Sequence, residues 1–262
     1  MNKDAVVTGA GSGIGRAFAR EIARRGGRVV CADIDLAGAK ETVRLIEADR
    51  GTALAIECDV SVEEQVVGLA ERAEEWFGGQ AGLVVNNAGI GAGGQVVGET
   101  PLADWRRTLG VNLWGVVHGC HVFAPRLREG GGIINVASAA AFAAAPRMAP
   151  YNVSKAGVLA LSETLVAEGV RVTVLCPTFV KTNILAAGLI DERTARLGER
   201  AMRWIGFSPE RVARIALDAH DKGRLYVLPQ FDARVVWRLK RHAPVAYTRA
   251  LGLIERLARR GG

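Results

Sequence analysis

Short apolar segments alternate with amphipathic segments along almost the whole chain. Between the apolar segments lie runs with apolar residues on one helical face, such as Val62 to Phe77 and Pro209 to His220. This alternation predicts an α/β fold, a single doubly wound domain with helices on both faces of a parallel sheet. The predicted strands lie near residues 5–7, 28–32, 52–58, 83–86, 132–137, 171–175 and 224–228.

A glycine-rich turn directly follows the first predicted strand. The turn reads Thr8-Gly-Ala-Gly-Ser-Gly-Ile-Gly15, and residues 16–25 then follow a helical pattern. Glycine lets backbone N–H groups approach phosphates closely, and the dipole of the following helix favours negative charge. The pattern therefore predicts a site for the pyrophosphate of a dinucleotide.

An acidic residue ends the second predicted strand, about twenty residues after this turn. At this place Asp33 would accept hydrogen bonds from both hydroxyls of an adenosine ribose. The alternative is that Asp33 caps the helix beginning near Leu36, although Asp35 can cap that helix itself. A carboxylate repels a 2′-phosphate and so favours NAD over NADP, whereas Arg16 and Arg28 would favour NADP.

Three polar residues in the second half of the chain form a candidate acid/base group. Tyr151 and Lys155 share a face of a predicted helix, and Ser138 ends a predicted strand thirteen residues before Tyr151. A tyrosine acting near neutrality needs its pKa of about 10 lowered by roughly 3 units, which a nearby cation can do. We expect Lys155 to be that cation. The alternatives are a half-buried aromatic residue for Tyr151 and a strand-end cap for Ser138.

These features resemble the short-chain dehydrogenase/reductase superfamily over residues 1 to about 230. The resemblance implies a Rossmann-type domain with a parallel seven-stranded sheet and an NAD-dependent oxidoreductase, with NADP less favoured. Besides the glycine turn, the matching elements are Cys58-Asp-Val60, Asn86-Asn-Ala-Gly89, Gly110-Val-Asn-Leu-Trp-Gly115, Ser138, Tyr151 and Lys155.

The resemblance also implies a role for individual residues. Tyr151 would transfer a proton, Ser138 would hydrogen-bond the substrate oxygen, and Lys155 would hold the nicotinamide ribose. Asn112 would complete the proton path, and Asp59 would contact the adenine. The expected cofactor-binding residues are Gly9, Ser12, Gly13, Ile14, Gly15, Asp33, Asp59, Val60, Asn86, Ala88, Gly89, Tyr151, Lys155, Pro177, Val180 and Thr182.

One position departs from the family pattern. The family usually has Pro-Gly after the sixth strand, where this chain has Pro177-Thr178. A side chain at position 178 is expected to crowd the nicotinamide or the substrate entrance, and so to tune specificity.

Apolar residues dominate the two segments expected to surround the substrate. These are residues 139–150 and a lid over residues 184–207. Such walls suit a hydrophobic alcohol or ketone better than a sugar, although the lid side chains could instead form the core of the lid itself. The functional alternatives are a fatty acyl or aldehyde reductase, and a non-catalytic membrane- or partner-binding protein that retains the fold.

Composition places further bounds. The chain has 262 residues, of which 49% are hydrophobic and 23% charged, as expected for one sizeable α/β domain. No apolar run reaches the roughly 18 residues of a membrane span, and no signal peptide is expected, so a cytoplasmic location is predicted. No metal site is expected, because His118 and His121 lack a third ligand. The four cysteines lack paired spacing and are expected to be reduced, packed thiols.

Two predicted helices, over residues 104–123 and 151–165, are apolar nearly all round. A helix of this kind must be covered on both sides, which predicts self-association into a homodimer or homotetramer. In the resembling family these two helices form a four-helix interface.

A basic extension, residues 231–262, follows the predicted domain of residues 1–230. Residues 234–262 hold eight basic groups against Glu255, and the rest of the chain is neutral although the total is +7. Apolar residues recur on one helical face from Tyr247 to Ala258, which is typical of an interfacial helix at an anionic membrane. The alternative is a helix packed on the body or on a partner subunit. Nucleic acid is disfavoured, because no recognition motif accompanies the charge.

Overall fold

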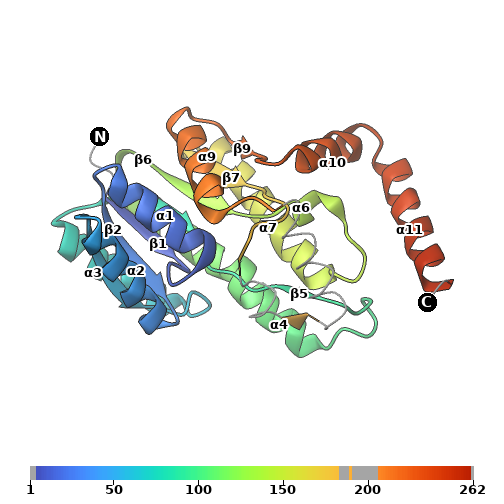
Figure 1. The fold of residues 1–262 in the computed structure, drawn as a ribbon, viewed down its shortest axis with the longest axis horizontal. Helices are drawn as coiled ribbons and strands as arrows, with labels where there is room; N and C mark the ends of the chain where they lie inside the picture. The colour runs from blue at the N-terminus through green and yellow to red at the C-terminus, as the bar shows by residue number, and fades with distance from the viewer. Residues whose placement is uncertain (1–3, 183–188, 191–205, 261–262) are drawn as a thin grey trace.

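The structure, a computed structural model, describes residues 4–182, 189–190 and 206–260. Its centre is a parallel sheet of seven strands in the order β3-β2-β1-β4-β6-β7-β9 (Figure 1). The predicted α/β fold with a parallel seven-stranded sheet is confirmed. The strands are β1 (Ala5–Thr8), β2 (Arg28–Asp33), β3 (Thr52–Glu57), β4 (Ala81–Asn86), β6 (Leu127–Val136), β7 (Val172–Leu175) and β9 (Tyr226–Val227).

Helices cover both faces of this sheet. Helices α1 (Gly13–Arg24), α2 (Leu36–Ala48) and α9 (Pro209–Asp221) pack on one face, and α3 (Glu63–Phe77), α5 (Gly115–Phe123) and α7 (Ala149–Ala167) pack on the other. The inner strands are buried on both sides, so they read as continuous apolar runs in the sequence. Strand order reverses between β1 and β4, and ligands of doubly wound folds bind at such a switch point.

The apolar segment predicted as one helix over residues 104–123 is interrupted. Helix α4 (Leu102–Leu109) passes into a π-helical turn, Gly110–Trp114, before α5 begins. A π turn inserts one extra residue into the helical ladder and often marks a functional site. The short elements are β5 (Ala92–Gly93), a 3-10 turn (Ala124–Arg126), α6 (Ala140–Ala143) and β8 (Leu189–Ile190), which pairs with β5.

The basic extension is helical, as predicted, but it forms two helices. In α10 (Phe231–His242), Trp237 packs edge-on against Phe142 at 5.0 Å and tilts against Tyr226 at 5.2 Å between ring centroids. Helix α11 (Pro244–Arg260) then runs along the end of the molecule that carries the C-terminus (Figure 1). Helix α10 is therefore part of the packed body, whereas α11 forms an arm beside it.

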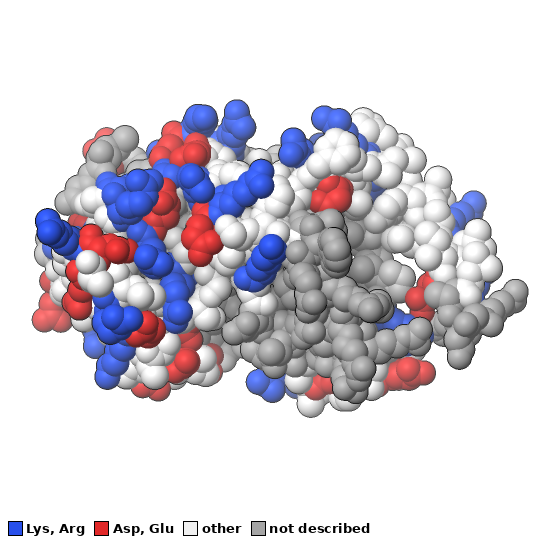
Figure 2. All heavy atoms as spheres, viewed as in Figure 1, with Lys and Arg blue, Asp and Glu red and all other residues white. Residues whose placement is uncertain are grey.

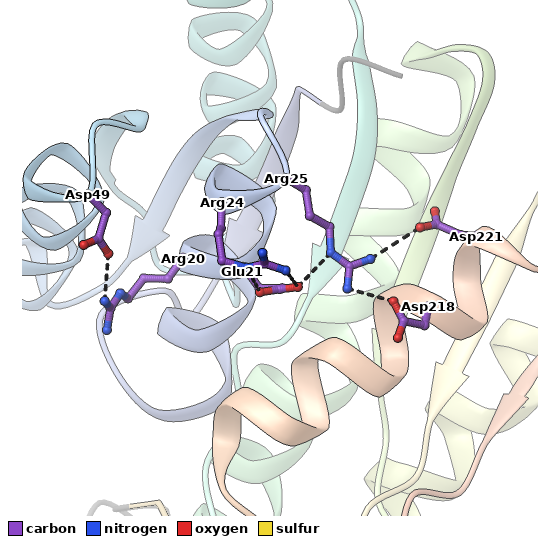
Figure 3. A network of polar contacts seen from close by, with 7 residues as sticks. All are labelled: Arg20, Glu21, Arg24, Arg25, Asp49, Asp218 and Asp221. Carbon is purple, nitrogen blue, oxygen red and sulfur yellow. Dashed lines mark hydrogen bonds and ion pairs between the residues drawn. The ribbon is translucent and has the colours of Figure 1, made fainter.

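Charged side chains along the outer face of α1 tie it to α9 (Figure 3). Glu21 accepts from Arg24 at 2.7 Å and from Arg25 at 2.8 Å, and Arg25 continues to Asp218 at 2.8 Å and Asp221 at 3.5 Å. The hydrogen bond from Arg24 is the largest of several effects that lower the pKa of Glu21 to about 2. This network holds the helix whose first turn follows the glycine-rich segment.

The four cysteines are free and buried, as predicted, and burial raises the pKa of the Cys31 thiol to about 12. Within the described ranges, no helix is long and apolar enough to cross a membrane. The same ranges contain no cluster of three potential metal ligands. Most of the expected lid, residues 184–207, lies outside the described residues.

Candidate active site

The glycine turn between β1 and α1 forms a cradle that side chains would fill. Gly9 and Gly13 have φ values of 64° and 51°, which L-residues rarely adopt. A Cβ added to Gly15 would lie 2.0 Å from the carbonyl oxygen of Gly9. Ser12 precedes α1 without capping it through its side chain, and the first turn of α1 contains no acid. These residues, with Ile14 in that turn, fit a pyrophosphate at a helix N-terminus.

The carboxylate of Asp33 lies against this turn. Its Oδ2 accepts a hydrogen bond from the Gly11 N–H at 2.7 Å, and its Oδ1 accepts from the Asp35 N–H at 2.9 Å. Asp35 caps α2 itself, accepting from the Ala37 N–H at 3.1 Å. Asp33 is therefore not needed as the cap of α2, and each of its oxygens retains acceptor capacity for a ribose hydroxyl.

The two arginines that would favour NADP lie in different places. Arg28 pairs with Asp4 at 2.8 Å and donates to the Phe77 carbonyl at 2.8 Å, at the opposite end of β2 from Asp33. Arg16 donates to the Thr42 hydroxyl at 3.0 Å and to the Gly11 carbonyl. Arg16 therefore remains beside the glycine turn, whereas Arg28 does not.

A side-chain clasp joins the ends of β1 and β4. The Thr8 hydroxyl accepts from the backbone N–H groups of Asn87 at 3.0 Å and Ala88 at 3.1 Å. The Asn87 amide donates back to the Thr8 carbonyl at 2.9 Å. A Cβ on Gly9 would lie 2.8 Å from the Ala88 Cα, so the two loops are in close contact. Asn87 was not among the expected site residues, although the adjacent asparagines at positions 86 and 87 could have indicated it.

The side chain of Asn86 points away from this contact. Its amide donates to the Asn135 oxygen at 2.9 Å, and Asn135 donates to the Ser162 hydroxyl at 3.0 Å. All three side chains are buried. Only the backbone of Asn86 is therefore available at the strand end.

Asp59 and Val60 follow β3 at the same edge of the sheet. The Asp59 carboxylate accepts from the Ser61 N–H at 2.9 Å and from the Ser61 hydroxyl at 2.7 Å. The carbonyl of buried Val60 lies 2.9 Å from Nδ1 of His118 in α5. His118 is thus engaged in packing between α5 and the loop after β3.

Ser138, Tyr151 and Lys155 come together where β6 meets α7. Lys155 is 3% exposed, and its ammonium donates to the Val136 carbonyl at 2.9 Å and lies 5.8 Å from the centroid of the Tyr151 ring. The Ser138 side chain lies close enough to the Tyr151 phenol to influence its pKa, and the Ser138 hydroxyl donates to the Pro177 carbonyl at 3.4 Å. The predicted trio is thus assembled by the fold.

The pKa of Tyr151 does not follow the expectation. Burial raises the pKa of the Tyr151 phenol, and the hydrogen bond with Ser138 opposes this shift. Burial also lowers the pKa of Lys155 to about 8. Because the pKa of Lys155, about 8, lies below the raised pKa of Tyr151, the lysine loses its charge before the phenol ionises and does not lower the Tyr151 pKa in this structure.

Asn112 lies in the π turn and is fully buried. Its side chain accepts from the Ile90 N–H at 2.7 Å and donates to the Ile90 carbonyl at 2.8 Å. A Cβ on Gly89 would lie 3.1 Å from the Asn112 oxygen and 3.5 Å from the Lys155 ammonium. The amide of Asn112 therefore holds the loop after β4 beside Lys155, while its place in a proton path stays a prediction.

The loop after β7 closes the site. The Pro177 carbonyl accepts from the Ala139 N–H at 2.9 Å, and buried Val180 pairs with Phe207. A Cβ on Gly13 would lie 3.1 Å from the Thr182 methyl carbon, so Thr182 stands over the glycine turn.

The side chain at position 178 is placed differently from the expectation. The Thr178 hydroxyl donates to Oδ1 of Asp232 in α10 at 3.2 Å. This bond joins the loop to the C-terminal extension, while the expected crowding of the nicotinamide stays a prediction. The sequence offered no pattern that pairs these two residues, because 54 positions separate them.

These features define a doubly wound dinucleotide-binding protein with a Ser-Tyr-Lys group beside the nucleotide edge. A family profile described as short chain dehydrogenase matches residues 3–192. The chain belongs to this family, as its sequence motifs predicted.

Similar proteins cover different shares of the chain. The probable oxidoreductase EphD of Mycobacterium bovis is 46% identical over 187 residues, which are 69% of this chain and 31% of EphD. This chain thus spans less than a third of the length of that relative. The 1-deoxy-11-beta-hydroxypentalenate dehydrogenase of Streptomyces exfoliatus is 36% identical over 254 residues, covering 91% of this chain and 90% of that protein.

Among solved structures, a short chain dehydrogenase/reductase from Burkholderia phymatum in complex with NAD is similar over most of its length. It is 37% identical with a TM-score of 0.84, and covers 92% of this chain and 93% of its own. The likeness therefore extends well beyond the glycine turn.

Proposed function

We propose that the chain is an NAD-dependent oxidoreductase that interconverts an alcohol and a ketone or aldehyde. The convergence of Ser138, Tyr151 and Lys155 beside the glycine turn carries this proposal. Tyr151 and Lys155 share α7, whereas Ser138 follows β6, so the fold is what brings the serine to the pair.

In the proposed mechanism the Tyr151 hydroxyl gives a proton to a carbonyl oxygen or takes one from an alcohol. Ser138, whose side chain lies near the Tyr151 phenol, would donate to the same substrate oxygen. Lys155 holds the nicotinamide ribose and lies within reach of the phenol ring. The bound nicotinamide supplies or accepts the hydride. Asn112 keeps the neighbouring loop in place through Ile90.

The proposed cofactor is NAD, with NADP less favoured. Asp33 presents a carboxylate beside the glycine turn, and Arg28 is bound to Asp4 at the far end of β2. A 2′-phosphate would be repelled by the Asp33 carboxylate. Of the two arginines, only Arg16 lies near the glycine turn. Its guanidinium already donates to the Thr42 hydroxyl and to the Gly11 carbonyl.

The proposed substrate is hydrophobic. Within residues 139–150, which connect Ser138 to Tyr151, Arg147 is the single charged residue. Its guanidinium pairs with Glu255 at 2.8 Å and donates to the Gly94 carbonyl at 3.3 Å. A wall whose one charge is already paired offers few groups to a polar substrate.

A cofactor-linked screen tests this function. Native protein is incubated with NAD and matched sets of hydrophobic secondary alcohols and polyols, and reduced cofactor is followed by absorbance. The expected result is faster turnover of the hydrophobic set. Preference for polyols would reject the substrate class, and cofactor binding without turnover of any alcohol or ketone would favour the non-catalytic alternative.

We also propose that the protein self-associates through α4, its π turn and α7. Trp114 is 55% exposed and Val153 is 48% exposed, although both lie in strongly apolar segments. Covering such side chains by a second copy would remove apolar surface from water. Sedimentation analysis of native protein and of Val153→Glu should show a dimer or tetramer that the charge disrupts.

Finally, we propose that α11 makes peripheral contact with an anionic membrane. Tyr247 donates to the Ala143 carbonyl at 2.8 Å, which fixes one side of the helix on the body. Beyond this contact Leu253, Ile254 and Leu257 remain 53%, 62% and 58% exposed, and arginines flank them. An exposed apolar stripe beside basic residues suits the headgroup region of an anionic membrane.

A further inference from the structure

Polar side chains at the start of α10 are bonded to the loop that follows β7. The Gln230 side chain is 3% exposed, and its Oε1 accepts from the Thr178 N–H at 3.2 Å. Its Nε2 donates to the Phe179 carbonyl at 2.9 Å. With the bond from the Thr178 hydroxyl to Asp232, this makes three hydrogen bonds, and we call these four residues the latch.

The Gln230 amide satisfies one backbone donor and one backbone acceptor of two consecutive loop residues, Thr178 and Phe179. A buried amide without partners is unfavourable, so the pairing is selective for this loop position. Gln230 directly precedes α10, and α10 is fixed to the body by the packing of Trp237 on Phe142. The latch therefore rests on a rigid element.

The loop held by the latch reaches the site at both of its ends. At one end the Pro177 carbonyl accepts from the Ser138 hydroxyl at 3.4 Å. At the other end Val180 pairs with Phe207, and Thr182 lies against Gly13. A displacement of residues 178 and 179 would therefore also displace Ser138 and Thr182, the second of which is one of the expected cofactor-binding residues.

We propose that Gln230, Thr178 and Asp232 are positioning residues that set the affinity of the site for the nicotinamide half of the cofactor. This inference rests on the nicotinamide-dependent function proposed above. The adenosine half faces Asp33 and the glycine turn, and none of the hydrogen bonds given for the described residues connects the latch to Asp33. Substitutions in the latch should thus weaken binding of the nicotinamide half and leave binding of the adenosine half unchanged.

The test compares binding of NADH, followed by fluorescence, with binding of ADP-ribose, followed by calorimetry. Gln230→Leu removes both amide bonds and should weaken NADH binding about tenfold, while ADP-ribose binding stays within about twofold. Thr178→Val removes only the hydroxyl and should weaken NADH binding about threefold, and Thr178→Ser should restore it. Arg238→Ala, on the exposed face of the same helix, is the matched control and should change neither affinity.

Each outcome separates positioning from general destabilisation. Melting temperatures are recorded for all variants, and Thr178→Val with Thr178→Ser decides the matter if Gln230→Leu fails to fold. Variants that lose NADH and ADP-ribose affinity together, or that bind NADH as native protein does, would overturn the latch. Native protein that binds no nicotinamide cofactor would overturn the proposed function, and the latch with it.

Discussion

Helices α1 and α11 are both amphipathic and rich in arginine, yet they are used in opposite ways. Helix α1 buries Phe18 and Ile22 against the sheet, and its outer charges are paired with α9 (Figure 3). Helix α11 leaves Ile254 and Leu257 exposed. Figure 2 shows acidic and basic side chains interleaved over the half of the molecule that contains α1, whereas the α11 arm is largely uncharged on this face.

The difference shows that amphipathicity alone does not say what a helix covers. Helix α1 lies between two strands that pair with each other, so the short connections force it onto the sheet. No such constraint acts on α11, which follows the last strand and is fixed by Tyr247 and Glu255. We therefore expect catalytic function to depend on the region from β1 to α10, and membrane contact to depend on α11.

The largest effect on turnover is expected from Tyr151→Phe. Only the proton-transferring hydroxyl is deleted, so turnover should fall by about a thousandfold or more while NAD binding stays close to native. Initial rates and fluorescence titration check the two halves of the prediction. Activity comparable to that of the native protein would remove Tyr151 from the mechanism.

A smaller effect is expected from Asp33→Ala. Loss of hydrogen bonds from the ribose to a charged group should weaken NAD binding by about 1.5 to 3 kcal/mol. It should also reduce the difference between the affinities for NAD and NADP. Asp33→Asn isolates the charge, and Asp35→Ala, which removes the cap of α2, controls for local destabilisation. A native protein that already prefers NADP would show that the ribose assignment is wrong.

The pH dependence of stability tests whether the charge of Glu21 stabilises α1. The pKa of Glu21 is lowered to about 2 from 4.5, chiefly by the hydrogen bond from Arg24, and its side chain is 14% exposed. A lowered carboxyl pKa stabilises the fold fully above pH 4.5, and this contribution is lost as pH falls toward 2. Glu21→Gln should lower the free energy of unfolding at pH 7 by about 1 to 2 kcal/mol, allowing for solvent around Arg24.

Denaturant unfolding at several pH values checks this expectation. The difference between native protein and Glu21→Gln should shrink between pH 4.5 and 2, whereas Glu47→Gln, an exposed site on α2, should show little difference at any pH. A constant difference across this range would mean that the charge of Glu21 is not what stabilises α1.

The smallest effect on turnover is expected from truncation after Ala243, which removes α11 and keeps α10 with its latch. Binding to anionic vesicles should be lost, and in the full chain it should weaken with salt, because surface attraction is screened over roughly 8 to 10 Å. Vesicle sedimentation measures this, with Ile254→Glu testing the apolar stripe and Arg238→Ala as control. The membrane proposal would be wrong if the full-length protein does not bind vesicles and the truncated protein forms a smaller oligomer or is less stable. That result would assign α11 to a subunit contact.

The sequence predicted the strands closely where they are short and fully apolar, as in β1 and β4. It placed β6 later than it begins, because Leu127 pairs with Ala81 ahead of a register shift whose charged residues and glycines show no apolar pattern. The sequence also placed Asp33 and Ser138 at strand ends, where the structure has them, while their roles stay predictions. It missed contacts whose partner is remote, as for Thr178 and Asp232.

The sequence by itself determined the order of strands and helices, the glycine turn, and the spacing that puts Tyr151 and Lys155 on one helical face. These are local properties, set by glycine conformation, side-chain periodicity and helical pitch. Only the tertiary structure decided that the Asn112 amide bonds to Ile90, that the Lys155 ammonium donates to the Val136 carbonyl, and that the Gln230 amide bonds to the loop after β7. Hydrogen bonds between distant residues depend on how the elements pack, and no short pattern in the chain records that packing.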